Sequence, residues 1–145
     1  MIKKVLLAQT DTTVGFLSQS ASKLSLIKQR SSSKPFVRVF SSFTSLKKHN
    51  IRVPSSHKKM LRRSRKTTCI SKNCAFRIVK ESPHNLLLDK FNFLYSTSAN
   101  ESGSSYDETF CYNSSDIIVQ DARGLYEAAP SCIIKLGKKK VRRVR

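Results

Sequence analysis

Short apolar runs separated by polar breaks dominate the pattern of this chain, and they predict β-strands. The runs are rich in Val, Ile and Phe, as strands commonly are. Residues 91–95, Phe-Asn-Phe-Leu-Tyr, show the period-two alternation of a half-buried strand. The expected strands are Val5–Gln9, Pro35–Phe40, Thr67–Ser71, Ala75–Lys80, Phe91–Tyr95, Ile117–Asp121, Ser131–Leu136 and Lys140–Val144.

Helical signals are weaker and fall between these strands. A serine cap, Ser41 or Ser42, precedes one segment that stops at Asn50. The segment after residues 54–56 has only Met60 and Leu61 as apolar anchors, so we expect a surface helix with a basic outer face. The expected helices are Ala21–Lys28, Phe43–His49, His57–Ser64 and His84–Lys90. Strands mixed with short helices predict an α/β or α+β fold on a mixed sheet, and 145 residues predict one domain over 1–145.

Charge is the strongest global signal. The chain has 28 Lys and Arg against 9 Asp and Glu, a formal net charge of +19. No carboxylate occurs between Asp11 and Glu81, an interval that carries 17 Lys and Arg, and a second basic cluster occupies residues 138–145. A field of one sign predicts a polyanionic partner such as nucleotide phosphates, pyrophosphate or an RNA backbone. The alternative is a basic surface that serves only solubility.

The sequence gives no support for a membrane-spanning protein or for a metal site. No apolar run approaches the roughly 18 to 20 residues that span a bilayer. The run Val5–Gln9 is too short for an export signal, so we expect a cytoplasmic protein with reduced cysteines and no membrane partner. Cys69 and Cys74 are five residues apart, which is not the spacing of a zinc site. We expect Cys69 and Cys132 to be small core residues on strands.

The three histidines lie in polar or basic stretches. None has an obvious carboxylate partner to orient it as a catalytic base. We therefore expect surface positions for His49, His57 and His84.

Clusters of hydroxyls follow two of the expected strands. Residues 10–13 are Thr-Asp-Thr-Thr, and residues 96–100 are Ser-Thr-Ser-Ala-Asn. Ligands of open α/β sheets bind beyond the strand ends, where such short polar side chains hold a small polar ligand. The alternative is a pair of capped turns.

Two cations, Lys28 and Arg30, follow an apolar turn and precede a serine-rich break at residues 31–33. On an extended segment, residues two apart point to the same side. A lysine point charge beside an arginine fork suits a phosphate clamp, whereas the alternative is two ordinary surface cations. The sequence has neither a Walker loop nor a GxSxG elbow.

Six segments together resemble the YrdC-like domain family, in the family's order and over nearly the whole chain. They are QTDTTVGF (9–16), LIKQRSSSKPF (26–36), CAFRIVK (74–80), STSANESG (96–103), APSCIIKL (129–136) and KKVRRVR (139–145). The resemblance implies a twisted mixed-sheet α/β fold with short helices and a basic concave cavity. It also implies a nucleotidyltransferase, threonylcarbamoyl-AMP synthase, which converts threonine, bicarbonate and ATP to threonylcarbamoyl-AMP and pyrophosphate for the threonylcarbamoyladenosine modification of tRNA.

The same resemblance implies roles for individual residues. The implied ATP-binding residues are Lys28, Thr68, Ser98, Asn100 and Arg143, with Arg142 as the alternative to Arg143. The implied threonine-binding residues are Thr10, Arg30, Arg77, Ser98 and Ser131. Lys28 and Arg30 would act in catalysis. ATP enters as a substrate, and Mg²⁺ would be carried by the nucleotide because the sequence offers no carboxylate cluster for it.

The implied macromolecular partners are tRNA or another RNA and the proteins that transfer the threonylcarbamoyl group. This chain also departs from the family's pattern. Val39 occupies the place of a family histidine, and residues 62–66 replace an aromatic-proline-glycine segment. These departures leave an alternative, a non-enzymatic RNA- or nucleotide-binding module with the same fold. The retained Lys28–Arg30 pair and hydroxyl cluster favour the enzyme, since binding RNA alone does not require the hydroxyls.

Overall fold

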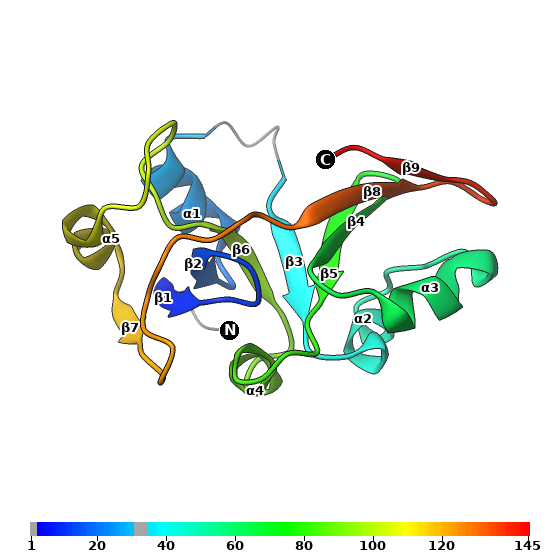
Figure 1. The fold of residues 1–145 in the computed structure, drawn as a ribbon, viewed down its shortest axis with the longest axis horizontal. Coiled ribbons are helices and arrows are strands. Elements are labelled where there is room, and N and C mark those ends of the chain that lie inside the picture. The colour runs from blue at the N-terminus through cyan, green and yellow to red at the C-terminus, as the bar shows by residue number, and fades with distance from the viewer. Residues whose placement is uncertain (1–2, 31–34) are drawn as a thin grey trace. The chain divides into compact units, whose positions relative to one another are not determined.

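The computed structural model describes residues 3–30 and 35–145, in which short strands alternate with short helices (Figure 1). The chain divides into two compact units. Unit 1 comprises Met1–Phe36 and Leu94–Ala129, and unit 2 comprises Val37–Phe93 and Pro130–Arg145. Each unit is therefore built from two separate stretches of sequence. One domain over residues 1–145 remains a prediction, and the serine break at residues 31–33 lies outside the described residues.

Unit 1 contains four strands in the order β7-β1-β2-β6. The strands are β1 (Leu6–Gln9), β2 (Val14–Ser18), β6 (Leu94–Ser98) and β7 (Ile117–Val119). β2 runs antiparallel to β1 and to β6, whereas β7 runs parallel to β1. All residues of β1 and β2 are buried, so neither strand alternates in hydrophobicity. The sequence analysis expected β1 as part of Val5–Gln9 but did not expect β2, which contains Gly15 and ends at Ser18.

Two helices complete unit 1, α1 (Ala21–Lys28) and α5 (Glu108–Ser114). The carboxylate of Asp107 caps α5 by accepting the amides of Thr109 and Phe110 at 3.0 and 3.3 Å. Such a cap satisfies amides that have no partner within the helix. The buried core of the unit consists of Val5, Leu7, Val14, Phe16, Leu24, Phe36, Ala99 and Cys111.

Unit 2 contains five strands in the order β3-β5-β4-β8-β9. They are β3 (Val37–Phe40), β4 (Thr67–Ser71), β5 (Cys74–Ile78), β8 (Cys132–Leu136) and β9 (Val141–Arg143). β3 is parallel to β5 and β4 is parallel to β8, while the β4–β5 and β8–β9 pairs are antiparallel. The helices are α2 (Phe43–Lys48), the 3-10 helix η1 (Ser55–His57), α3 (Lys58–Arg63) and α4 (His84–Asp89).

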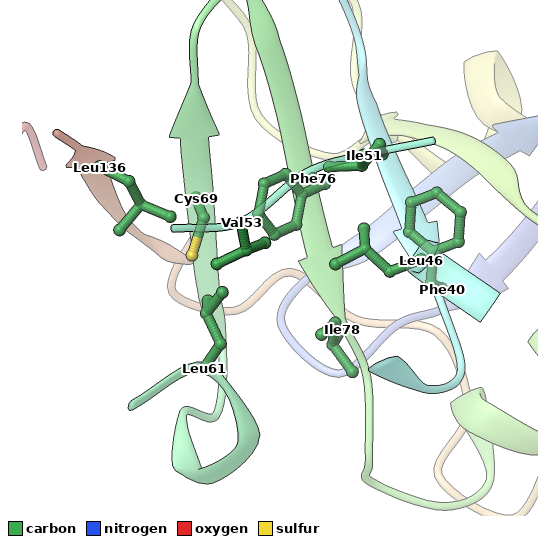
Figure 2. Packing of buried hydrophobic residues seen from close by; sticks show 9 residues of the cluster. All are labelled: Phe40, Leu46, Ile51, Val53, Leu61, Cys69, Phe76, Ile78 and Leu136. Atoms are coloured by element: carbon green, nitrogen blue, oxygen red, sulfur yellow. The ribbon is translucent and has the colours of Figure 1, made fainter. Parts of the chain in front are cut away.

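The core of unit 2 forms where apolar side chains of α2, α3 and the connecting loop gather over the strands. Figure 2 shows Leu46 and Leu61, from the two helices, beside Phe76 of β5 and Cys69 of β4. Met60 packs against the same cluster, so the two apolar anchors expected of this helix both face the core. Ser42 caps α2 by accepting the amide of Ser45, and Asn50 adopts a left-handed conformation with φ of 58°. Both features agree with the sequence signals.

The nine strands and short helices of the described residues confirm the mixed α/β fold class. Within the same residues, no helix has both the length and the apolar character to cross a membrane. The four cysteines are free, and Cys69 is buried on β4, whereas Cys132 is half-buried on β8.

The bounds expected for one strand are wrong. The strand expected at Phe91–Tyr95 corresponds to β6, which begins three residues later and runs through Ser98. The start is later because α4 continues to Asp89 and the amide of Phe91 still bonds to the Leu88 carbonyl at 3.0 Å. Ser96 to Ser98 are therefore strand residues and do not follow the strand.

The surface position expected of the histidines is also wrong. His57 and His84 are 4% and 1% exposed. The ring nitrogen Nε2 of His57 donates to the Gly137 carbonyl at 2.7 Å. His49 is half-buried, and its ring packs against Phe40 and Phe93. A basic sequence context did not reveal these packing roles.

Candidate active site

Lys28 is the centre of a polar network in unit 1. It is the last residue of α1 and is only 5% exposed. Its ammonium donates to the Ser98 carbonyl at 3.2 Å, to the Asn100 carbonyl at 2.8 Å and to Asn100 Oδ1 at 2.8 Å. An ammonium has three donors, so each N–H has one acceptor here. The network ties the end of α1 to the end of β6.

The turn after β6 is held by further bonds around Asn100. Its Oδ1 also accepts the Ser98 hydroxyl at 2.7 Å, and its Nδ2 donates to the Ser104 carbonyl at 2.6 Å. The Ser102 hydroxyl donates to the Lys28 carbonyl at 2.6 Å. Gly103 has φ of +80°, a conformation that favours glycine. This segment therefore forms a turn whose polar side chains are fixed by one another.

Burial lowers the pKa of the Lys28 ammonium, and the positive charge of Arg30 lowers it further. Removing a cation from water disfavours its charged form, as does a second cation nearby. Three oxygen acceptors offset part of this cost. A negatively charged ligand at this position would relieve the remainder, so the network favours an anion as its partner.

Arg30 departs from the extended geometry expected for the Lys28–Arg30 pair. Lys28 is helical, and Gln29 adopts a left-handed conformation with φ of 48°, so the segment is not an extended strand. The Arg30 guanidinium lies 4.8 Å from the centre of the Phe36 ring. A stacked guanidinium keeps its N–H donors at its edge, where they are able to bind a phosphate or carboxylate.

Thr10 begins the turn that joins β1 to β2. It is 3% exposed, and its hydroxyl donates to the Thr13 carbonyl and accepts the Thr12 amide at 3.1 Å. A side chain at Gly15 would meet the Thr10 methyl group at 3.0 Å and the Thr97 carbonyl at 3.1 Å. The Thr10 hydroxyl, which is expected to contact threonine, therefore stabilises the turn in this structure. Glycine at residue 15 leaves room for the Thr10 side chain.

A second polar cluster lies in unit 2, where neighbouring strands place Thr68 on β4, Arg77 on β5 and Ser131 just before β8. The Thr68 and Ser131 hydroxyls are 2.8 Å apart, and Arg77 donates to the Thr68 hydroxyl at 3.2 Å. Thr68 is 1% exposed, Arg77 6% and Ser131 5%. A buried guanidinium beside two hydroxyls is a donor set suited to a carboxylate or phosphate.

The terminal arginines occupy different places in unit 2. Arg143 and Arg142 are exposed on β9, opposite Ile134 and Lys135 of β8. Arg145, which the sequence did not single out, donates through Nε and through one terminal nitrogen to the Ser131 carbonyl at 3.1 and 3.0 Å. Arg145 lies beyond the end of β9, and its only sequence signal was its place in the basic cluster of residues 138–145.

The sequence-predicted residues thus fall into two groups. Unit 1 brings Lys28, Ser98 and Asn100 into one network, and unit 2 brings Thr68, Arg77 and Ser131 into another. Over residues 3–30 and 35–145, no three His, Cys, Asp or Glu side chains are grouped so as to hold a metal ion.

Comparison with solved structures relates this fold to several proteins, including the following four. The chain is 18% identical to the MTH1692 protein from Methanobacterium thermoautotrophicum, with 98% of this chain and 79% of that one covered and a TM-score of 0.72. It is 16% identical to E. coli YciO, with coverages of 99% and 82% and a TM-score of 0.77. At this identity the likeness concerns the fold.

Two larger proteins share the fold over part of their length. P. abyssi Sua5 complexed with L-threonine is 17% identical, with a TM-score of 0.78, and 98% of this chain covers 50% of that one. Full-length HypF in its phosphate- and nucleotide-bound form is 15% identical, with a TM-score of 0.76, and here 98% of this chain covers 26% of the other. The chain therefore spans half of that Sua5 and about a quarter of HypF. A comparison with curated proteins gave no match.

A family model extends over almost the whole chain. The Sua5/YciO/YrdC model, described as "Telomere recombination", matches residues 3–145 and so includes both polar clusters. With this match over both units, the chain belongs to the Sua5/YciO/YrdC family.

Proposed function

We propose that this protein is a threonylcarbamoyl-AMP synthase that combines threonine, bicarbonate and ATP. The observation that carries the proposal is the buried Lys28 ammonium bonded to Ser98 and Asn100, a cation, a hydroxyl and an amide fixed at one strand end. Two proteins of the same fold support it. The Sua5 structure is a complex with L-threonine, and the HypF structure contains phosphate and nucleotide.

The proposed residue roles follow the two clusters. In unit 1, Thr10 and Arg30 bind threonine and Asn100 binds ATP, with Ser98 contributing to both, while Lys28 supports the ATP site through its charge and the turn that it holds. In unit 2, Thr68 and Arg143 bind the nucleotide, and Arg77 and Ser131 bind threonine. The Ser131 carbonyl is fixed by Arg145, which we add as a positioning residue.

The proposed reaction requires that the substrates be positioned and that the charge developing on the phosphates be stabilised. The threonine amine and bicarbonate condense to a carbamate with loss of water, and the carbamate oxygen then attacks the α-phosphate of ATP. A new O–P bond forms as the bond to pyrophosphate breaks. Fixed donors aimed at the developing charge stabilise such phosphoryl-transfer steps without a histidine base. Mg²⁺ would accompany the ATP phosphates and neutralise the leaving group.

Lys28 and Arg30 have different parts in this proposal. The Lys28 ammonium already has three protein acceptors, so it holds the Ser98–Asn100 turn and adds positive charge beneath the ligand. The edge of the stacked Arg30 guanidinium provides the direct contact to the phosphate or carboxylate. We therefore assign to Arg30 the larger effect on binding.

The test is pyrophosphate release by purified protein supplied with threonine, bicarbonate, Mg²⁺ and ATP. We expect release that requires threonine and falls about 100-fold or more in Arg30→Ala, since a direct charge contact in phosphoryl transfer is lost. Arg52→Ala removes an exposed arginine of unit 2 and is the matched control. Wild-type release no greater than that of Arg30→Ala would reject the proposal.

A second function, RNA binding by unit 2, is favoured by the partition of charge. Unit 2 contains 21 of the 28 Lys and Arg and two of the nine Asp and Glu, which gives it a formal charge of +19. Unit 1 contains seven Lys and Arg and seven Asp and Glu, so it is formally neutral. Catalysis on small substrates does not require such an excess, whereas an RNA backbone does.

Two basic segments of unit 2 are joined by hydrogen bonds. The Ser56 hydroxyl donates to the Lys138 carbonyl at 2.8 Å, and His57 donates to Gly137 at 2.7 Å. These bonds hold the turn between β8 and β9 against η1, which leads directly into α3. The exposed cations of the two segments are Lys59, Arg62, Arg63, Lys138, Lys139 and Lys140.

Salt titration of RNA binding tests this second function. Replacing Lys138, Lys139 and Lys140 together by Gln should lower the slope of log K against log salt by about two to three, because each phosphate contact contributes just under one. The control replaces Lys3, Lys4 and Lys23, which are exposed in unit 1, by Gln. Equal slopes in the two triple variants, or binding that is insensitive to salt, would exclude this surface.

A further inference from the structure

The segment that follows β7 returns along the turn between β1 and β2. Within unit 1, the amide of Tyr126 donates to Gln9 Oε1 at 2.9 Å, and the Tyr126 carbonyl accepts the Val14 amide at 3.2 Å. The amide of Ala128 donates to the Thr13 hydroxyl at 3.0 Å. We call residues 121–128 the strap. Its bonds reach both sides of the Thr10–Thr13 turn, more than 110 residues away in sequence.

Arg123 is the strap residue that contacts the end of β1 most extensively. Its two terminal nitrogens donate to the carbonyls of Thr10 and Gln9 at 3.0 and 2.9 Å. Its Nε and one terminal nitrogen also donate to the two carboxylate oxygens of Asp121 at 3.0 and 2.8 Å. A planar guanidinium with five fixed donors makes these four bonds at once, whereas a lysine ammonium has only three donors.

We propose that Arg123 is a positioning residue that fixes the Thr10–Thr13 turn and thereby sets the affinity for the amino-acid substrate. The part about affinity rests on the proposed function, in which Thr10 belongs to the threonine-binding residues. Asp121 anchors the guanidinium from the strap side, so the carbonyls of Gln9 and Thr10 are held from a fixed point.

An ordinary surface ion pair does not account for this arrangement. Exposed pairs contribute little and are free to change partners in water. Here the side chains of Arg123 and Asp121 are 27% and 25% exposed, and half of the guanidinium's bonds go to backbone carbonyls at the end of a buried strand. The Asp121 carboxylate raises the pKa of Arg123, so the guanidinium stays charged. The contact therefore acts on backbone position, and the turn is the element whose position it determines.

Hydrogen exchange tests the structural half of the proposal without requiring activity. The amides of Thr12, Val14 and Ala128 report on the turn and the strap. We expect Arg123→Ala to accelerate their exchange about tenfold or more relative to wild type, and Arg123→Lys to give an intermediate value. The control, Lys23→Ala, removes an exposed cation of unit 1 and should change none of them. Unchanged exchange in Arg123→Ala would overturn the proposal.

Steady-state kinetics tests the functional half. A turn held loosely should raise the KM for threonine about tenfold in Arg123→Ala, while the KM for ATP and kcat change less than about threefold. Arg123→Lys should recover part of the threonine affinity, and it remains informative if the alanine variant does not fold. Equal changes in the two KM values would overturn the role in substrate affinity.

A failure of the proposed function can be told apart from a failure of the role proposed for Arg123. If wild-type protein forms no product, the proposed function fails, and calorimetric titration with threonine alone then decides the role of Arg123 in amino-acid binding. Weaker threonine binding in Arg123→Lys than in Lys23→Ala would support the role. Equal binding in these two variants would reject it.

Discussion

The ammonium of Lys28 donates to the side-chain oxygen of Asn100 at 2.8 Å, across 72 positions of sequence. This bond joins the C-terminal end of α1 to the turn after β6, and the Ser98 hydroxyl donates to the same oxygen. Unit 1 thus fixes a cation, an amide and a hydroxyl in one network before any ligand binds. Preorganised groups of this kind lose little entropy when a ligand arrives.

Asn100→Ala removes an acceptor from a buried ammonium. We expect the free energy of unfolding to fall by about 1–3 kcal/mol, which is the cost of leaving one charged donor without its partner. Chemical denaturation measures this change. Asn113→Ala, at an exposed position of α5, should change the free energy by less than about 0.5 kcal/mol. Similar values for the two variants would contradict the importance of the network.

Gly15→Ala tests the space beneath the Thr10 turn. The added methyl group would lie 3.0 Å from the Thr10 methyl and 3.1 Å from a backbone carbonyl, so we expect a loss of about 1–3 kcal/mol in unfolding free energy and altered amide shifts at residues 10–13. Gly103→Ala is the comparison, because its φ is +80° and nothing lies within 4 Å of the added carbon. That variant should lose about 1–2 kcal/mol from backbone strain and leave residues 10–13 unshifted. Unperturbed amide shifts in Gly15→Ala would argue against close contact at this position.

Cys69 predicts a loss of stability at high pH. Burial raises the pKa of its thiol from 9.0 to about 12, with a smaller effect of Cys132. Because the folded pKa lies above the unfolded value, the contribution is complete below about pH 9 and is lost as pH rises toward 12. Each pH unit in this window should remove about 1.4 kcal/mol from the free energy of unfolding.

Comparison with Cys69→Ala isolates the contribution of this thiol to the pH dependence of stability. The variant should be less stable at pH 7, because a buried side chain is shortened, but its stability should decline less steeply above pH 9. Parallel pH profiles for the two proteins would show that Cys69 does not carry the effect.

Much of the fold was predictable where local signals agree with tertiary structure. Residues 67–71 and 21–28 were expected as a strand and a helix with the bounds that the structure has. Two elements, β2 and α5, were not predicted from the sequence. β2 is buried at every position and does not alternate, and α5 depends on the Asp107 cap and on aromatic residues that pack into unit 1. Burial on both faces removes the periodicity on which sequence patterns depend.

The resemblance supplied candidate residues for the site but not their bonding. The resemblance selected Lys28, Ser98 and Asn100, and the structure joins them in one network. All three donors of the Lys28 ammonium bond to acceptors of the protein. These acceptors lie 70 or more positions away in the sequence, so no local pattern encodes the bonds. Arg123 was missed for the same reason, since its carbonyl partners, Gln9 and Thr10, lie more than 110 positions away.

The most direct test of the proposed function is detection of its product. Wild-type protein is incubated with labelled bicarbonate, threonine, Mg²⁺ and ATP, and the nucleotides are separated by chromatography. The proposal predicts a labelled adenylate whose mass is that of threonylcarbamoyl-AMP, formed only when threonine and ATP are both present and formed much more slowly by Arg30→Ala. Absence of the labelled adenylate from the wild-type reaction, in protein that is folded and binds ATP, would contradict it.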